Sequence, residues 1–139
     1  MDLNLTVQRH PDPWLDLLRP YVLDVVTTMA RSGVRIQESW LDPRDPRDAT
    51  IVCAGSGSGL VGLVWDEETG WRTGEFVDGR QGSRTVLRDV VHVGGGLLPS
   101  PAGLAQDLIK GDGQPQRSYR SHRDLRDGLD ETLRSWPRL

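Results

Sequence analysis

The sequence predicts an α+β domain: an N-terminal helix, an antiparallel sheet of about five strands, a closing helix and a C-terminal helical extension. Residues 34–93 hold short β-branched and apolar runs separated by turn residues, with no helical period between them. Helical spacing of apolar residues instead flanks this region, at 14–31 and 101–110. Strands that follow one another without an intervening helix pair antiparallel, so helices are expected on one face of the sheet.

The N-terminal helical pattern contains a proline that divides it. Residues 1–13 end in H-P-D-P and predict a flexible arm. From residue 14 to residue 31 the apolar side chains form one broad face. Pro20 has no N–H to donate and its ring clashes with the preceding turn. A short helix over 14–19, then a main helix that ends at Gly33, is therefore predicted.

The five predicted strands are bounded by turn-forming sequences, namely L-D-P-R-D-P-R-D, G-S-G-S-G, D-E-E-T-G and G-R-Q-G-S. The strands are expected at 34–40, 50–54, 60–65, 71–77 and 85–93. Ser100 and Pro101 are a typical N-cap and first helical residue, so a helix over 101–110 should close a domain that spans 14–110.

The C-terminal segment predicts a further helix, over 117–139, joined by a polar linker at 111–116. Its apolar and amphipathic residues recur at intervals of three and four positions, namely Tyr119, His122, Leu125, Leu129, Leu133 and Trp136. A helix of this length is marginal alone in water, so its apolar face needs a cover. The cover could be the domain's own sheet or another chain. We expect another protein chain, with a second copy of this one as a candidate.

Composition limits the functional classes. The 139 residues fit one domain and include a single cysteine, Cys53, so an intramolecular disulfide is excluded and a cytoplasmic protein is expected. Cys53 is expected to be buried on a central strand. No apolar run approaches the roughly 18 residues of a membrane-spanning helix, so no membrane partner is predicted. The net charge of −3 does not favour binding to nucleic acid, and acidic residues flank the arginines at 117, 120, 123 and 126.

Two motifs resemble a known family. The chain contains W-D-E-E-T-G-W at 65–71 and, after a further strand, G-G-G-L-L-P-S-P at 94–101. Over roughly 21–110 it resembles a small actinobacterial family of unknown function, in which a W-D-E-containing hairpin and a G-G-x-x-L-P-x-P turn lie between two helices. The resemblance implies this organisation and an actinobacterial source, which the use of one lysine among 17 basic residues also favours. It implies no catalytic residues.

Several residues are candidates for a site. Trp65 and Trp71 end the strands on either side of the D-E-E-T turn, where they can brace the hairpin as a cross-strand pair. The acidic turn could instead be a recognition surface, or its Asp66 and Glu68 a carboxylate pair. Arg72 and Arg84 would form a cationic patch for a carboxylate or phosphate if they face the same side. His92 ends an apolar strand, where it could be a satisfied edge residue or line a pocket.

The absence of a recognisable catalytic set, metal-ligand spacing or cofactor motif favours a protein-interaction module. Such a module would bind its partner through the sheet face and the C-terminal helix. The alternative is a small-molecule-binding protein or small enzyme with a pocket between sheet and helices. The residues expected to contact a ligand or partner are Trp65, Trp71, Arg72, Arg84, His92, Leu125, Leu129 and Trp136.

Overall fold

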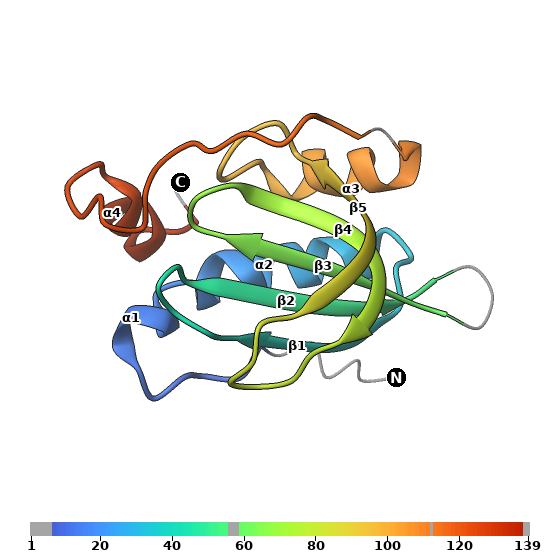
Figure 1. Ribbon diagram of the computed structural model, residues 1–139, viewed down its shortest axis with the longest axis horizontal. Helices are drawn as coiled ribbons and strands as arrows, with labels where there is room; N and C mark the ends of the chain where they lie inside the picture. The colour runs from blue at the N-terminus through green and yellow to red at the C-terminus, as the bar shows by residue number, and fades with distance from the viewer. Residues whose placement is uncertain (1–6, 56–58, 112, 138–139) are drawn as a thin grey trace.

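The computed structural model describes residues 7–55, 59–111 and 113–137. Within them the strands form one antiparallel sheet in the order β1-β2-β3-β4-β5, which confirms the predicted α+β class. Figure 1 shows α2 crossing one face of this sheet. In these residues we find no helix whose length and apolar character would let it cross a membrane. The elements are α1 (Pro13–Asp16), α2 (Arg19–Arg31), β1 (Ile36–Leu41), β2 (Asp48–Ala54), β3 (Leu60–Asp66), β4 (Gly70–Asp78), β5 (Val86–Val93), α3 (Pro101–Lys110) and α4 (Leu129–Arg134).

The proline positions set the boundaries of the first two helices. The carboxylate of Asp12 accepts a hydrogen bond from the Trp14 N–H and caps α1, with Pro13 as first residue. Pro20 is the second residue of α2, where the missing N–H leaves no bond unmade. The expected arm is packed at its described end, because Val7 is buried and its carbonyl accepts a hydrogen bond from Nε of Arg19. The rest of the arm, 1–6, lies outside the described residues.

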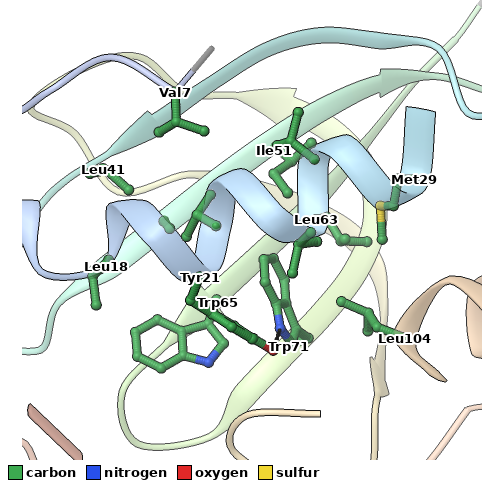
Figure 2. Close-up of a cluster of buried hydrophobic side chains, with 14 of the residues drawn as sticks. Val7, Leu18, Tyr21, Met29, Leu41, Ile51, Leu63, Trp65, Trp71 and Leu104 are labelled. Atoms are coloured by element: carbon green, nitrogen blue, oxygen red, sulfur yellow. Dashed lines mark hydrogen bonds between the residues drawn. The ribbon is translucent and has the colours of Figure 1, made fainter. Parts of the chain in front are cut away.

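The helix-facing side of the sheet carries the core. Trp65 and Trp71 are register partners and both are fully buried, which confirms that they face each other across the turn. The indole N–H of Trp71 donates to the hydroxyl of Tyr21 on α2 at 3.1 Å, and that hydroxyl donates to the carbonyl of Pro99 at 2.7 Å. Figure 2 shows these rings beside Leu63 and Leu104. Trp71 therefore joins the sheet to α2 and, through Tyr21, to the loop that leads into α3. Cys53, on β2, is buried in the same core, as expected.

The two motifs noted in the sequence pack against each other. The indole N–H of Trp65 donates to the carbonyl of Leu97 at 2.7 Å. Gly70 has a φ of +77°, and a Cβ built there would lie 2.7 Å from the carbonyl oxygen of Gly96. Only glycine adopts this positive φ without strain and also leaves room for the Gly96 carbonyl. The turn after β3 and the glycine-rich loop after β5 therefore fit together closely.

The second face of the sheet is concave, because the β4–β5 hairpin curls over it (Figure 1). Register shifts interrupt the pairing of β4 and β5, and irregularities of this kind increase local twist. A Cβ at Gly62 would lie 2.4 Å from Leu87 Cδ2, so the glycine makes room for the hairpin to approach β3. At the far end the hydroxyls of Thr50 and Thr85 are hydrogen-bonded at 2.7 Å. Residues 56–58 of the predicted G-S-G-S-G connector lie outside the described residues.

The C-terminal helix is much shorter than predicted. The expected helix over 117–139 was wrong in length, because only α4 is helical in the described part of this segment. Two local features oppose a helix before it: the N–H of Tyr119 donates to the carbonyl of Glu68 at 2.7 Å, and Gly128 has a φ of +93°. Leu125, which the helical pattern placed on one face with the later leucines, is 59% exposed.

The apolar face of α4 is covered by the chain itself. Leu129 and Leu133 are buried in the common core. The rings of Trp136 and Tyr21 meet edge-on, with their centroids 4.8 Å apart. The indole N–H of Trp136 donates to the carboxylate of Asp24 on α2 at 3.0 Å. The expectation that another chain covers this face is therefore wrong for these residues.

Candidate functional site

A pocket of about 480 Å³ opens on the concave face of the sheet. It lies between the loop before β2, the turn between β3 and β4, the β4–β5 hairpin, and the C-terminal segment at Gln116. Most of its lining residues carry polar side chains. The ionisable residues that line it are Asp48, Asp66, Glu68, Arg72, Arg84 and His92.

The register of the sheet places most of these side chains together. Arg72 of β4 is the partner of Val64 on β3 and of His92 on β5. Asp48 of β2 is the partner of Asp66 on β3. Side chains two positions apart in a strand share a face, so these pairs form adjacent rows on the face opposite the tryptophans.

Asp66 organises the β3–β4 turn and orients an arginine. Its Oδ1 accepts the N–H groups of Glu68 and Thr69 at 2.8 and 2.7 Å, the usual role of an aspartate that begins a turn. Its Oδ2 accepts a hydrogen bond from Nη1 of Arg72 at 2.7 Å. The other guanidinium N–H groups of Arg72 have no hydrogen bond among the described residues. Arg72 is thus held in place at one nitrogen and can donate to a ligand with the others.

Asp48 is the least satisfied side chain of the pocket. It is 2% exposed, yet its Oδ1 has no hydrogen-bond partner in the described part of the chain. Nη1 of Arg84 lies 3.1 Å from Oδ1, close enough for an ion pair but not aligned as a hydrogen bond. Nη2 of Arg84 donates instead to the carbonyls of Arg44 and Asp45. Burial raises the pKa of Asp48 to about 7, although the charges of Arg84 and Arg72 act against this.

His92 contributes a second unsatisfied atom. Its carbonyl accepts a hydrogen bond from the N–H of Gln114 at 2.7 Å, but its ring nitrogen Nδ1 is buried without a partner among the described residues. Burial, together with the positive charge of Arg72, lowers the pKa of His92, while the charge of Asp66 opposes the shift. The imidazole is therefore mainly neutral at pH 7 and can donate or accept one hydrogen bond at Nδ1.

A neighbouring ionic cluster is fully satisfied and stabilises the walls of the pocket. Arg47 and Glu67 are buried and form an ion pair. The guanidinium of Arg47 also contacts Asp130 at 2.8 Å, and its Cζ lies 4.7 Å from the centroid of the Trp14 ring. Arg120 pairs with Glu67 at 2.7 Å. Burial acts to raise the pKa of Glu67, but the hydrogen bonds from the two arginines outweigh it and lower that pKa. This cluster fixes the C-terminal segment to the sheet.

The predicted site residues are partly brought together. Arg72, Arg84 and His92 line one pocket. Arg72 and Arg84 thus lie on the same side, which is the condition that the cationic patch was predicted on. Trp65 and Trp71 face the helices instead. The three C-terminal candidates are also elsewhere: Leu129 and Trp136 pack against the core, and Leu125 is exposed outside the pocket.

Sequence reasoning missed Asp48. The second strand was predicted to begin at Thr50, which left Asp48 in the preceding polar loop, whereas β2 begins at Asp48. The alternation of Asp48, Thr50 and Val52 on one face was the available signal. No three His, Cys, Asp or Glu side chains of the described ranges are grouped so that they could hold a metal ion.

The chain matches a family model described as "Family of unknown function (DUF6292)" over residues 21–109. It belongs to that family. Neither a curated protein nor a solved structure matches the chain. The matched region contains Asp48, Arg72, Arg84 and His92, whereas α4 lies outside it. The pocket is therefore built mainly from the part of the chain that the family shares.

Proposed function

We propose that this protein binds a small polar molecule in the pocket on the concave face, through Asp48, Arg72, Arg84 and His92. The observation that supports this most strongly is a pair of buried polar atoms in one pocket, Oδ1 of Asp48 and Nδ1 of His92, that make no hydrogen bond within the described part of the chain. Oδ1 has an ion pair with Arg84. A buried polar atom without a hydrogen bond costs about 1–3 kcal/mol. A ligand that supplies both missing bonds would recover that free energy, which is a reason to expect affinity here.

The interaction-module hypothesis has less support. It required an apolar C-terminal helix free to meet a partner, but Leu129 and Leu133 are buried in this chain's own core. It also required an open sheet face, yet α2 covers one face and the β4–β5 hairpin curls over the other (Figure 1). We therefore favour ligand binding. We keep an actinobacterial cytoplasm as the proposed setting, on the basis of the arginine-rich composition and the single cysteine.

Thermal unfolding in the presence of small polar compounds tests the proposal. The panel should contain amino acids, short peptides, carboxylic acids, sugar phosphates and nucleosides. A ligand at one hundred times its Kd adds about 2.7 kcal/mol of stability, which should raise Tm by roughly 5–10 °C.

The matched variants are Arg72→Gln combined with His92→Gln, in the pocket, and Arg88→Gln, an exposed arginine on β5 that pairs with Glu75 outside it. We expect a compound that stabilises the wild type and Arg88→Gln but not the double variant. If every compound shifts the double variant as much as the wild type, the pocket is not the binding site and the proposal fails.

A further inference from the structure

The pocket presents opposite charges from different strands. Asp48 projects from β2, and Arg72 projects from β4, with β3 between them. Neighbouring strands lie about 4.8 Å apart, so roughly 10 Å separates the backbones that carry the two groups. Both side chains reach into the same pocket and shorten this gap.

The two arginines of the pocket are not equivalent. Arg84 is already committed to backbone carbonyls of the loop at 44–46 and to the ion pair with Asp48. Arg72 makes only its hydrogen bond to Asp66 among the described residues. An anionic group on a ligand would therefore find its donors at Arg72, which can offer two N–H groups in a fork. His92 lies next to Arg72 in the register, and its Nδ1 makes no hydrogen bond to any described residue.

The opposite end of the pocket needs a hydrogen-bond donor. Asp48 is buried, and its Oδ1 has an ion pair with Arg84 but no hydrogen bond in the described ranges. In its ionised form the Asp48 carboxylate only accepts hydrogen bonds, so a group that satisfies this form must carry N–H or O–H. A primary ammonium supplies both the donors and a compensating charge.

We infer that the ligand of this pocket is a zwitterion whose ammonium and carboxylate are several bonds apart, as in a dipeptide or an ω-amino acid. The ammonium binds Asp48 and the carboxylate binds Arg72 beside His92. The inference rests on the proposed function of the pocket and specifies its ligand class. An α-amino acid carries both charges on one carbon, so it spans less of the roughly 10 Å between the two strands than a dipeptide does. A volume of about 480 Å³ is sufficient for a dipeptide.

Calorimetry with matched probes tests this inference. Glycylglycine and 5-aminopentanoate carry both charges, N-acetylglycylglycine lacks the ammonium, and glycylglycine amide lacks the carboxylate. We expect at least one of the two zwitterions to bind the wild type, and the capped peptides to bind at least ten-fold more weakly than glycylglycine. Asp48→Asn should weaken zwitterion binding at least ten-fold, and so should Arg72→Gln. Arg88→Gln is the control that should leave binding unchanged.

The outcomes separate the inference from the proposed function. If a capped peptide binds as tightly as glycylglycine, or if neither zwitterion binds, the zwitterion inference is overturned. The pocket proposal then survives only if another compound of the thermal panel depends on Arg72 and His92. If Asp48→Asn does not fold, the comparison of capped and uncapped peptides on the wild type still decides the ligand class.

Discussion

Glu67 binds Arg47 through three hydrogen bonds at once. Nε and Nη2 of the guanidinium donate to the two carboxylate oxygens at 3.0 Å, and the backbone N–H of Arg47 donates to Oε2 at 2.6 Å. Both side chains are buried. Arg47 directly precedes Asp48, and Glu67 directly follows Asp66. The pair therefore fixes the ends of β2 and β3 from which two pocket carboxylates project.

Replacing Glu67 should lower the free energy of unfolding by more than breaking an exposed ion pair does. Glu67→Gln removes the carboxylate that Arg47 and Arg120 share and leaves them only Asp130 and Asp127 as acidic partners. Breaking a buried pair in this way costs up to about 3–5 kcal/mol. The control is Glu75→Gln, whose partner Arg88 is exposed, with an expected change below about 1 kcal/mol. Urea unfolding measures both. Equal losses in the two variants would contradict a structural role for the buried cluster.

Asp48→Asn should stabilise the unliganded protein more at pH 8 than at pH 5. The folded-state pKa of Asp48 is about 7, against an ordinary value of 3.8. Between these pH values the folded state keeps a proton that the unfolded state has lost, so the free energy of unfolding falls as pH rises. The slope is about 1.4 kcal/mol per pH unit in that window. Asparagine does not titrate. Denaturant unfolding at both pH values gives the difference, and a variant effect that is the same at pH 5 and pH 8 would refute the raised pKa.

Trp71→Ala should be among the most destabilising core substitutions. The ring is fully buried, and its N–H is bonded to Tyr21. Loss of a buried tryptophan side chain costs about 3–5 kcal/mol. Ile109→Ala is the control, because Ile109 is exposed on α3. Chemical denaturation measures the change, and a loss below about 1 kcal/mol for Trp71→Ala would mean that the ring does not support the core.

Two leucines of the C-terminal segment distinguish docking on this chain from docking on a partner. Leu133→Ala removes a buried side chain and should cost about 2–5 kcal/mol in the isolated protein. Leu125→Ala removes an exposed side chain and should change stability by less than about 0.5 kcal/mol. The comparison uses thermal unfolding at low protein concentration. A Leu133→Ala variant as stable as Leu125→Ala would show that α4 is not part of the core in solution.

Cys53 should be unreactive in the native protein. The thiol is buried, and burial raises its pKa to about 11, so little thiolate forms at neutral pH. Labelling by a thiol reagent at pH 7.5 should be many-fold slower in buffer than in denaturant. Labelling at the same rate in both conditions would place Cys53 at the surface.

The fold class followed from local signals in the sequence. Ser100 and Pro101 begin α3 at the predicted residue, and Gly111, with a φ of +73°, follows its last residue, Lys110. The short polar turns set the order of the strands, and Trp65 and Trp71 met across the turn as the pattern predicted. Caps, prolines and turn glycines act within a few residues of one another, so the sequence alone contains the information they carry.

The site and the C-terminal segment depended on contacts between distant residues. Helical spacing predicted a long helix, but the hairpin binds the backbone of Tyr119 and Glu67 binds Arg120, and these contacts outweigh a weak helix propensity. Asp48 became part of a pocket only because the β4–β5 hairpin curls over the concave face and brings Arg84 against it. Local sequence determined which elements form, whereas the curvature of the sheet and the burial of charge, set by the whole fold, determined which side chains meet.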